Sequence, residues 1–257
     1  MSDATLETAE RILSAPLARE LRVKAIGGIG CWLHVRDHGP GAEPCRRHYG
    51  DVDLALPRGG SKRLGQLMGE VGLKPVESFN ANSGASRRMF VSADAGVQVD
   101  VFIGAFSMCH EVPLPDEAFA PPEQLSLGAT ELLMTKLQVV QLSEKDVHDA
   151  ASLLSFHDLG PGSDSIDADR MAQLLAADWG LWRTVTQSLE RIRAKAAAGV
   201  VPAPALAGDV QDRVDELSRR IDAAKKSLKW RTRARVGDRV QWYEEPEEPD
   251  KEWIPVR

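Results

Sequence analysis

The segment Asp51-Val52-Asp53-Leu54-Ala55-Leu56 alternates polar and apolar residues with the period of a β-strand. In a strand, its valine and leucines share one face, which would be buried, while Asp51 and Asp53 share the other. A second strand-like segment, residues 97–103, places Asp100 on the face opposite its β-branched residues. A carboxylate at such a position is costly unless it is paired or bound to a metal ion. We therefore predict that the three carboxylates point away from the core.

Three carboxylates on neighbouring strands suit a pair of divalent cations. Residues two apart on a strand are separated by about 6.5 Å at the backbone, and side chains can converge on ions about 3.5–4 Å apart, as in two-metal phosphoryl-transfer sites. Oxygen-only ligands favour Mg²⁺ or Mn²⁺. The sequence thus predicts Asp51, Asp53 and Asp100 as metal ligands and catalytic residues.

A glycine-rich turn precedes these acids. Residues 23–26 predict a short buried strand, and residues 31–35 predict a helix. Between them, Gly27 and Gly28 would let the backbone approach a phosphate at the start of that helix. We predict that both glycines bind nucleotide phosphates.

This order of elements resembles the nucleotidyltransferase superfamily with the polymerase-beta-like fold. The shared pattern is a strand, Gly-Gly or Gly-Ser, a helix, Asp-x-Asp on the next strand, and a third Asp on a later strand. Residues 131–142 and 145–149 are similar to the Lys-Leu helix and the Lys/Arg-Asp-x-x-Asp helix of the abortive-infection nucleotidyltransferase toxins and their uncharacterised bacterial relatives. The matches cover residues 20–190. The chain departs from the compact pattern, because 22 residues separate Gly28 from Asp51 and an inserted loop lies around residues 38–44.

The resemblance implies an α+β fold in which a nucleotidyltransferase-type mixed β-sheet flanked by helices is followed by an α-helical C-terminal region. It implies nucleotide-binding roles for Lys136 and Asp146, with His148 and Asp149 as secondary candidates. From the residues alone, Lys136 could equally be a surface lysine whose stem covers apolar atoms, and Asp146 an acid near a helix N-terminus.

Two basic clusters stand close to the acids in sequence. Arg46-Arg47-His48 precede Asp51, and Arg87-Arg88 precede the strand of Asp100. Guanidinium groups match phosphate oxygens, so we expect contacts with the triphosphate or the acceptor, and assign Arg87 and Arg88 to nucleotide binding. The alternative for each arginine is a solvated loop.

Prolines and helical periodicity predict three parts. A nucleotidyltransferase core spans residues 1–125 and ends in a proline-rich loop, residues 111–126; a helical domain spans 126–230, and a tail that turns from basic to acidic spans 231–257. Trp179 and Trp182 are assigned to the core. The local elements that we expect are a helix over 4–20 broken at Pro16, a helix over 61–72, a strand over 73–76, a hairpin over 88–103 that turns at 94–96, a helix over 131–142, and a helix that starts at 143–146.

Two longer segments repeat apolar residues at spacings of three and four, residues 171–196 and 210–228. They predict an antiparallel helical hairpin or a homodimer contact.

Composition sets the broad class. With 43% hydrophobic and 27% charged residues, the 257-residue chain falls among ordinary globular proteins. It contains no apolar run near the length of a membrane span and no signal-like N-terminus, so we expect no membrane partner.

Three cysteines at no framework spacing predict a reducing, cytoplasmic location. Cys45 with His48 and Cys109 with His110 could supply four zinc ligands, although neither pair has Cys-x-x-Cys spacing.

The net charge of −6 argues against a dedicated nucleic-acid coat but not against a local basic surface. Residues 225–239 carry seven Lys or Arg against one Asp. They form the predicted RNA-facing surface if the acceptor is RNA, or otherwise a solvated helix face.

These observations predict a Mg²⁺-dependent enzyme, with Mn²⁺ as the alternative ion, that transfers a nucleoside monophosphate from a nucleoside triphosphate such as ATP to an acceptor hydroxyl. The acceptor would be RNA, tRNA or a protein, and in a toxin the enzyme would have an antitoxin partner. A second hypothesis assigns a small cationic acceptor such as an aminoglycoside or lincosamide, which the acidic net charge favours. A third is a non-catalytic nucleotide-binding module.

Overall fold

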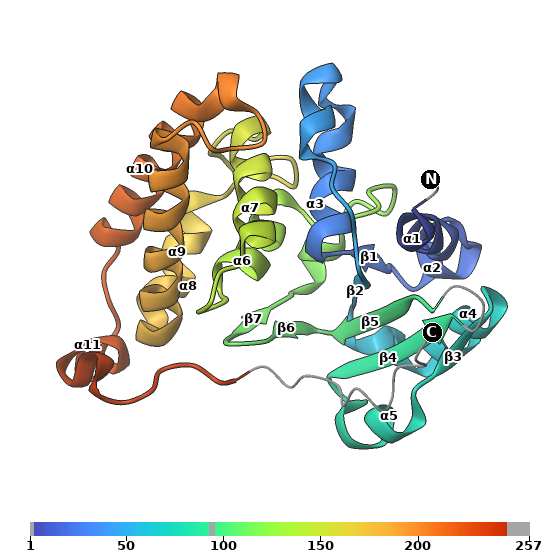
Figure 1. The fold of residues 1–257 in the computed structure, drawn as a ribbon. Helices are drawn as coiled ribbons and strands as arrows, with labels where there is room; N and C mark the ends of the chain where they lie inside the picture. The colour runs from blue at the N-terminus through green and yellow to red at the C-terminus, as the bar shows by residue number, and fades with distance from the viewer. Residues whose placement is uncertain (1–2, 93–95, 246–257) are drawn as a thin grey trace.

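A computed structural model describes residues 3–92 and 96–245 (Figure 1). It contains a five-stranded mixed β-sheet with helices around it, followed by a helical C-terminal region, as the sequence predicts. The strands are β1 (Lys24–Ala25), β2 (Val52–Leu56), β3 (Leu73–Pro75), β4 (Arg87–Ser92) and β5 (Gln98–Ile103), in the spatial order β1-β2-β5-β4-β3.

The register of the sheet brings the predicted acids together. β2 and β5 run parallel, whereas every other neighbouring pair of strands in this sheet is antiparallel. Asp53 is the direct partner of Asp100 across β2 and β5. β4 and β5 form the predicted hairpin, in which the Ser92 N–H donates to the Val97 carbonyl at 2.9 Å. Two of the predicted turn residues, 94 and 95, lie outside the described residues.

Helices surround the sheet and build the C-terminal region (Figure 1). Those of the first half are α1 (Ala4–Ser14), α2 (Pro16–Glu20), α3 (Gly27–Val35), α4 (Leu64–Glu70) and α5 (Glu77–Ser83). Those of the second half are α6 (Ala129–Leu137), α7 (Glu144–Phe156), α8 (Ala168–Ala177), α9 (Trp179–Ala197), α10 (Ala207–Ala223) and α11 (Leu228–Val236). Short 3-10 helices cover Arg36–His38, Pro40–Cys45, Arg58–Arg63, Asp116–Phe119, Pro204–Leu206 and Gly237–Arg239.

Several local predictions are confirmed. The first helix is broken at Pro16, and α7 begins with a capping box in which the Ser143 side chain accepts from the Asp146 N–H and Asp146 accepts from the Ser143 N–H. The apolar residues of α9 and α10 face each other and are buried, which confirms the helical hairpin. The second predicted seam ends earlier than expected, because α10 stops at Ala223 and Leu228 begins α11 with 73% of its surface exposed.

Other local predictions are wrong in detail. The helix expected at residues 31–35 already begins at Gly27, and the single helix expected over 171–196 is two, because Asp178 caps α9 through the Leu181 N–H at 3.0 Å. Within the predicted proline-rich loop, β7 (Glu111–Pro113) pairs with β6 (Ala105–Ser107). Three-residue strands are too short to show an alternating pattern. The polar helix α5 was not predicted, because it buries only Phe79.

The sheet part and the helical part share one apolar cluster, which extends from Leu6 in α1 to Ile221 in α10. α3 lies at its centre and contacts β2, α6 and α7, so eight of its nine residues are buried. Its first turn is therefore fixed beside the start of β2, where Asp53 lies (Figure 1). Trp179 is buried and Trp182 packs partly buried against this cluster, as predicted.

No helix in residues 3–92 and 96–245 is long and apolar enough to cross a bilayer.

Candidate functional site

Two of the three predicted acids lie on adjacent strands. Asp53 on β2 is partly buried, and its register partner Asp100 on β5 is 1% exposed. Asp51 precedes β2 by one residue and is exposed. The three carboxylates are close enough to interact electrostatically, but their oxygens do not all lie within 4.8 Å of one another. The structure thus brings the acids to one region without closing them into a compact cage.

Asp53 is the acid whose environment is most perturbed. Its side chain makes no hydrogen bond or ion pair with any residue that the structure describes. Burial, followed by the charges of Asp51 and Asp100, raises the pKa of Asp53 to about 7. A cation bound here would relieve the repulsion among the carboxylates and favour their ionised forms.

Asp100 is held by two neighbours. The Arg87 Nε donates to Asp100 Oδ1 at 2.8 Å, and the Gln98 Nε2 donates to Asp100 Oδ2 at 2.7 Å. The Arg87 guanidinium also lies over the Phe79 and Phe102 rings, 5.4 and 5.0 Å from their centroids. Arg87, predicted to contact nucleotide, is therefore the ion-pair partner of Asp100 in this structure. Gln98 was not predicted, although it lies two residues from Asp100 and so on the same face of the strand.

Arg88 points to the other face of β4, as the next residue of a strand must. Its Nε donates to the Gly84 carbonyl at 3.0 Å and its Nη1 to the Ser61 carbonyl at 3.1 Å. Arg88 thus connects the end of α5 to the segment before α4 by hydrogen bonds and does not contact the three acids.

The glycine pair lies between two charged groups at the start of α3. Gly27 has a φ of +62°, and a Cβ on it would overlap the Asp53 carboxylate. A Cβ on Gly28 would overlap the Arg47 guanidinium and lie 3.2 Å from Asp149 Oδ2. Only glycine fits both positions, because any side chain there would displace a charged group.

The second charged group consists of Arg47, Lys136, Asp146 and Asp149, and we call it the Lys136 cluster. Arg47 donates to Asp149 through Nε at 2.8 Å and Nη2 at 2.7 Å. The Lys136 Nζ lies 2.9 Å from Asp149 Oδ2 and 3.2 Å from Asp146 Oδ1. Because Asp149 is 2% exposed and joins both cations, it is the hub of the cluster.

The charges of the Lys136 cluster stabilise one another. Burial alone would lower the pKa of Lys136, but the Asp149 and Asp146 carboxylates hold this pKa above its ordinary value. Burial would likewise raise the pKa of Asp149, but Lys136 and Arg47 hold it below its ordinary value. The contacts within the cluster therefore favour the ionised forms of Lys136 and Asp149.

The inserted loop between α3 and β2 takes part in this arrangement. Arg47 comes from this loop, and the Cys45 carbonyl lies 3.0 Å from the His148 Nε2 on α7. The loop thus packs on α7 and brings a guanidinium next to Gly28. Within the sequence, Arg47 and Asp149 lie 102 residues apart, so their pairing has no local signal.

The zinc ligands considered in the sequence do not come together. In the described part of the chain, Cys45, His48, Cys109 and His110 form no group with ligand atoms within 4.8 Å. His110 Nε2 instead lies 2.8 Å from the Thr184 hydroxyl. All three cysteines of the chain are buried and free.

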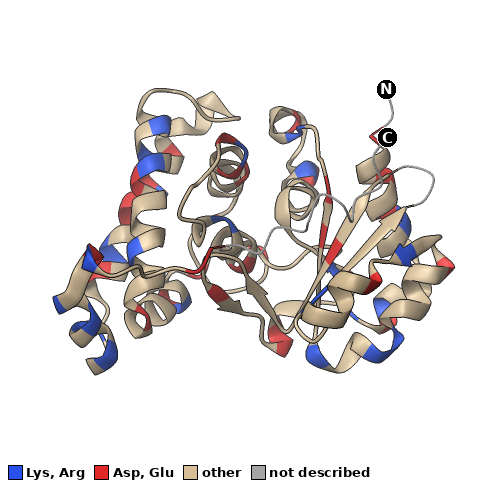
Figure 2. Cartoon of the chain, turned by 60° about the horizontal axis from the view of Figure 1, so that its bottom comes forward, with Lys and Arg blue, Asp and Glu red and all other residues tan. Residues whose placement is uncertain are grey.

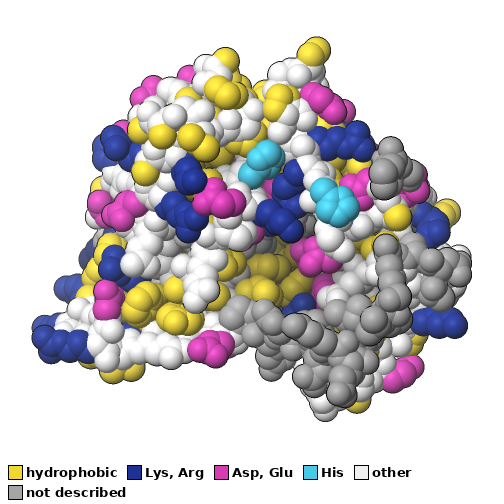
Figure 3. All heavy atoms as spheres, viewed as in Figure 1, with side chains coloured by type: hydrophobic (Ala, Val, Ile, Leu, Met, Phe, Trp, Pro, Cys, Tyr) yellow, Lys and Arg dark blue, Asp and Glu magenta, His cyan; other side chains and the backbone are white. Residues whose placement is uncertain are grey.

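Figure 3 shows one face of the molecule. Acidic and basic side chains and two histidines gather beside a recess between the sheet part and the helical part. Comparison of the chain with family models, curated proteins and solved structures finds no significant match in any of the three.

Proposed function

We propose that this chain is a Mg²⁺-dependent nucleotidyltransferase that transfers a nucleoside monophosphate from a nucleoside triphosphate to an acceptor hydroxyl. The observation that carries the proposal is the approach of Gly27, at the start of α3, to the carboxylate of Asp53, whose strand partner is Asp100. A helix N-terminus favours phosphate, and the acids beside it favour a divalent cation. The order of strand, glycine pair, helix and acid-bearing strands also supports a nucleotidyltransferase-type sheet.

The three acids are suitable ligands for Mg²⁺. Asp51 and Asp53 offer carboxylates that are free of partners among the described residues, and Asp53 has a raised pKa that a cation would lower. Bound Mg²⁺ would neutralise charge on the triphosphate and polarise the α-phosphate. Asp100 would share in this binding, since Arg87 and Gln98 leave a lone pair on each of its oxygens.

The reaction has a simple balance. The acceptor oxygen bonds to the α-phosphorus, the bond from that phosphorus to the bridging oxygen of the β-phosphate breaks, and pyrophosphate leaves. Asp100 takes the proton of the acceptor hydroxyl as general base. Arg87 is a positioning residue, because it holds one oxygen of Asp100.

The glycine pair would bind the phosphates of the nucleotide, and the Lys136 cluster would hold the glycine pair in place. Gly27 and Gly28 would present backbone N–H groups to the phosphates. Lys136 and Asp146 were assigned to the nucleotide by resemblance; here they act with Asp149 and Arg47 to fix the start of α3, where the backbone N–H groups would meet the phosphates.

The test is incubation of the purified protein with each labelled nucleoside triphosphate, Mg²⁺ and either total tRNA or cell extract. We expect transfer of label, and its loss in Asp53→Asn and Asp51→Asn. Asp212→Asn, a change of an exposed acid on α10, is the matched control and should transfer label like the wild type. Equal labelling by wild type and Asp53→Asn would contradict the proposed mechanism. Nucleotide binding without transfer would favour a non-catalytic module.

RNA is the acceptor that the surface favours. α11 exposes Lys229, Arg231 and Arg235, and the ribbon in Figure 2 is blue at several basic positions along this helix, at the opposite end of the molecule from the sheet. A basic surface attracts a phosphate backbone. A panel of aminoglycosides in the same assay tests the small-molecule alternative, and labelling of an aminoglycoside in preference to tRNA would replace RNA as acceptor.

A further inference from the structure

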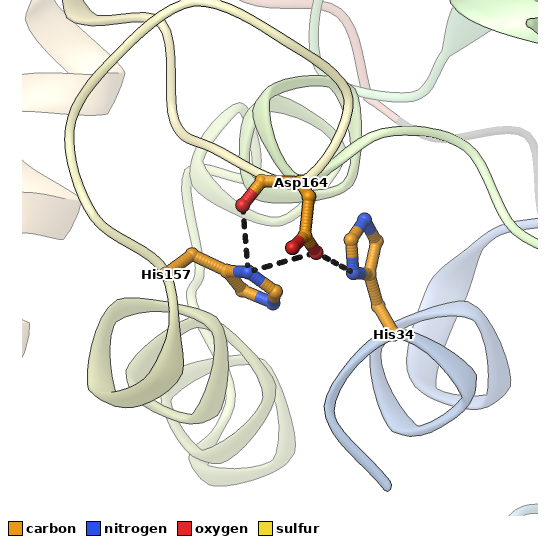
Figure 4. Close-up of side chains that lie close together, drawn as sticks. All are labelled: His34, His157 and Asp164. Atoms are coloured by element: carbon orange, nitrogen blue, oxygen red, sulfur yellow. Dashed lines mark hydrogen bonds and ion pairs between the residues drawn. The ribbon is translucent and has the colours of Figure 1, made fainter. Parts of the chain in front are cut away.

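Two histidines and an aspartate meet at the far end of α3 from the glycine pair (Figure 4). His34 lies near the C-terminus of α3, His157 follows α7, and Asp164 lies in the loop that leads to α8. Asp164 Oδ1 is 3.7 Å from His34 Nδ1 and 3.6 Å from His157 Nδ1. In the part of the chain that the structure describes, these residues form the only group of three His, Cys, Asp or Glu whose ligand atoms all lie within 4.8 Å.

The two rings are buried and oriented by the chain. His34 is 8% exposed, and its Nε2 lies 3.1 Å from the Ser163 carbonyl and 3.0 Å from the Gln124 Nε2. That edge of the ring is engaged by protein groups, so its Nδ1 edge faces Asp164. Metal-binding histidines are typically fixed in this way, with the second nitrogen held by a backbone carbonyl.

His157 is the least satisfied member of the cluster. It is 1% exposed, its Nδ1 lies 3.2 Å from the Asp164 carbonyl, and its Nε2 is buried without a hydrogen-bond partner. Its ring centroid lies 4.5 Å from that of His34. Because its Nδ1 lies beside both the carbonyl and the carboxylate of Asp164, Nδ1 is the nitrogen placed to bind an ion, and Nε2 takes no part in that binding.

The loop that presents Asp164 has a defined backbone. The Ile166 N–H donates to the Asp158 carbonyl at 2.9 Å, and the Gly160 N–H donates to the Ile166 carbonyl at 3.0 Å. The Asp164 side chain itself is 80% exposed, so it can adjust to a ligand while the two rings stay in place.

The spacing fits a tetrahedral metal ion. Zinc bound at about 2.0–2.2 Å by nitrogen and oxygen ligands places its ligand atoms about 3.3–3.6 Å apart. The two nitrogen–oxygen separations of 3.7 and 3.6 Å come close to that range. Imidazole ligands favour Zn²⁺ over Mg²⁺, which prefers oxygen.

We propose that His34, His157 and Asp164 form a Zn²⁺ site that joins α3 and the end of α7 to the loop before α8. The fourth position would open to a cavity of 490 Å³ that His34, Asp37, His38, Gln124 and Asp164 help to line. The site does not rest on the proposed nucleotidyl transfer, because none of its residues belongs to the acid group or the Lys136 cluster.

The experiment is calorimetric titration of metal-free protein with Zn²⁺, together with the metal content after dialysis. We expect one Zn²⁺ per chain and, at saturation, a rise in Tm of about 5 °C. Co²⁺ should give the visible absorption of a four-coordinate ion, whereas Mg²⁺ should not compete.

Variants decide whether these three residues hold the ion. Asp164→Asn changes an exposed side chain and should fold, yet weaken Zn²⁺ binding by at least about tenfold; His157→Asn should do the same. Asp37→Asn removes the same charge from the rim of the same cavity and should bind like the wild type, and Asp53→Asn should keep one Zn²⁺ per chain. Absence of stoichiometric Zn²⁺ binding, or equal weakening by Asp37→Asn and Asp164→Asn, would overturn the proposal.

Discussion

The carboxylate of Asp53 is partly buried next to two other acids, and this arrangement has a consequence for stability. An aspartate in an unfolded chain has a pKa near 4, whereas the folded protein raises the pKa of Asp53 to about 7. The folded state therefore binds this proton more tightly, so the free energy of unfolding falls as pH rises from about 4 to about 7. We predict that, in EDTA, wild type loses on the order of 2 kcal/mol relative to Asp53→Asn between pH 4 and pH 8.

Urea unfolding of both proteins at the two pH values measures this difference. Asp212→Asn, on the exposed face of α10, should follow the wild type. At pH 8, Mg²⁺ should stabilise the wild type and leave Asp53→Asn unchanged, because the cation relieves the repulsion that the variant lacks. Parallel pH profiles for wild type and Asp53→Asn would show that the carboxyl has an ordinary pKa.

Alanine substitutions at Gly27 and Gly72 distinguish the effect of backbone strain from the effect of a steric clash. Both have positive φ, +62° and +79°, but a Cβ would overlap the Asp53 carboxylate only at Gly27, whereas it meets nothing within 4 Å at Gly72. We predict that Gly72→Ala costs about 1 kcal/mol of stability and keeps transfer activity, since the strain is its main effect. Gly27→Ala should also displace Asp53 and lower activity about 100-fold. Urea unfolding and the labelling assay measure the two effects, and equal activity of the two variants would contradict the role of Gly27.

The strand patterns predict more of the site than the loops do. Period-two alternation and the β4–β5 hairpin place Asp53 and Asp100 on facing strands, because register follows from which residues are apolar. The partner of Asp100 could not be predicted in the same way, since Arg87 reaches it diagonally across β4 and β5. The link from Arg47 to Asp149 depends on how the inserted loop packs on α7, which no local pattern encodes.

α11 differs from the other long helices because it has no buried residue of its own. Below it lies a cavity of 760 Å³ that Trp179, Trp230 and Trp242 help to line, with the Arg233 guanidinium 4.6 Å from the Trp179 ring centroid. Exposed cations beside aromatic rings are typical of surfaces that bind single-stranded nucleic acid. The helix can therefore be altered on its exposed face without disturbing the core.

Charge reversal on α11 tests its part in RNA binding. The triple variant Lys229→Glu, Arg231→Glu and Arg235→Glu should raise the KM for tRNA at least about tenfold. The slope of log affinity for tRNA against log salt concentration should become less steep by about 2. The KM for the nucleoside triphosphate should not change. A matched control reverses Arg11, Arg19 and Lys74, which are exposed near the sheet, and should label tRNA like the wild type. Equal effects of the two triple variants would show attraction by overall charge only.

At the scale of the whole molecule, the sheet part and the helical part meet through α3. A Cβ on Gly30 would lie 2.8 Å from the Ala25 carbonyl oxygen and 2.9 Å from the Leu132 side chain, so α3 is wedged between β1 and α6. The sequence predicts a boundary between residues 125 and 126 from its prolines, and this boundary stays a prediction. Periodicity shows that α3 is apolar on all sides, but it does not show which element covers each side.

The position of α3 predicts how the two parts fold. In a fragment of residues 1–125, the face of α3 that contacts α6 and α7 would be exposed to water, as would part of the cluster that runs from Leu6 to Ile221. We expect this fragment to bind a hydrophobic dye and to unfold without a cooperative transition, whereas the full chain unfolds in one transition by both far-UV circular dichroism and tryptophan fluorescence. Co-expression with residues 126–257 should restore the cooperative transition, because it restores the cover of α3. A fragment 1–125 with a sharp urea transition of its own would instead show that the sheet part is stable without the helices and that the predicted boundary divides two independent domains.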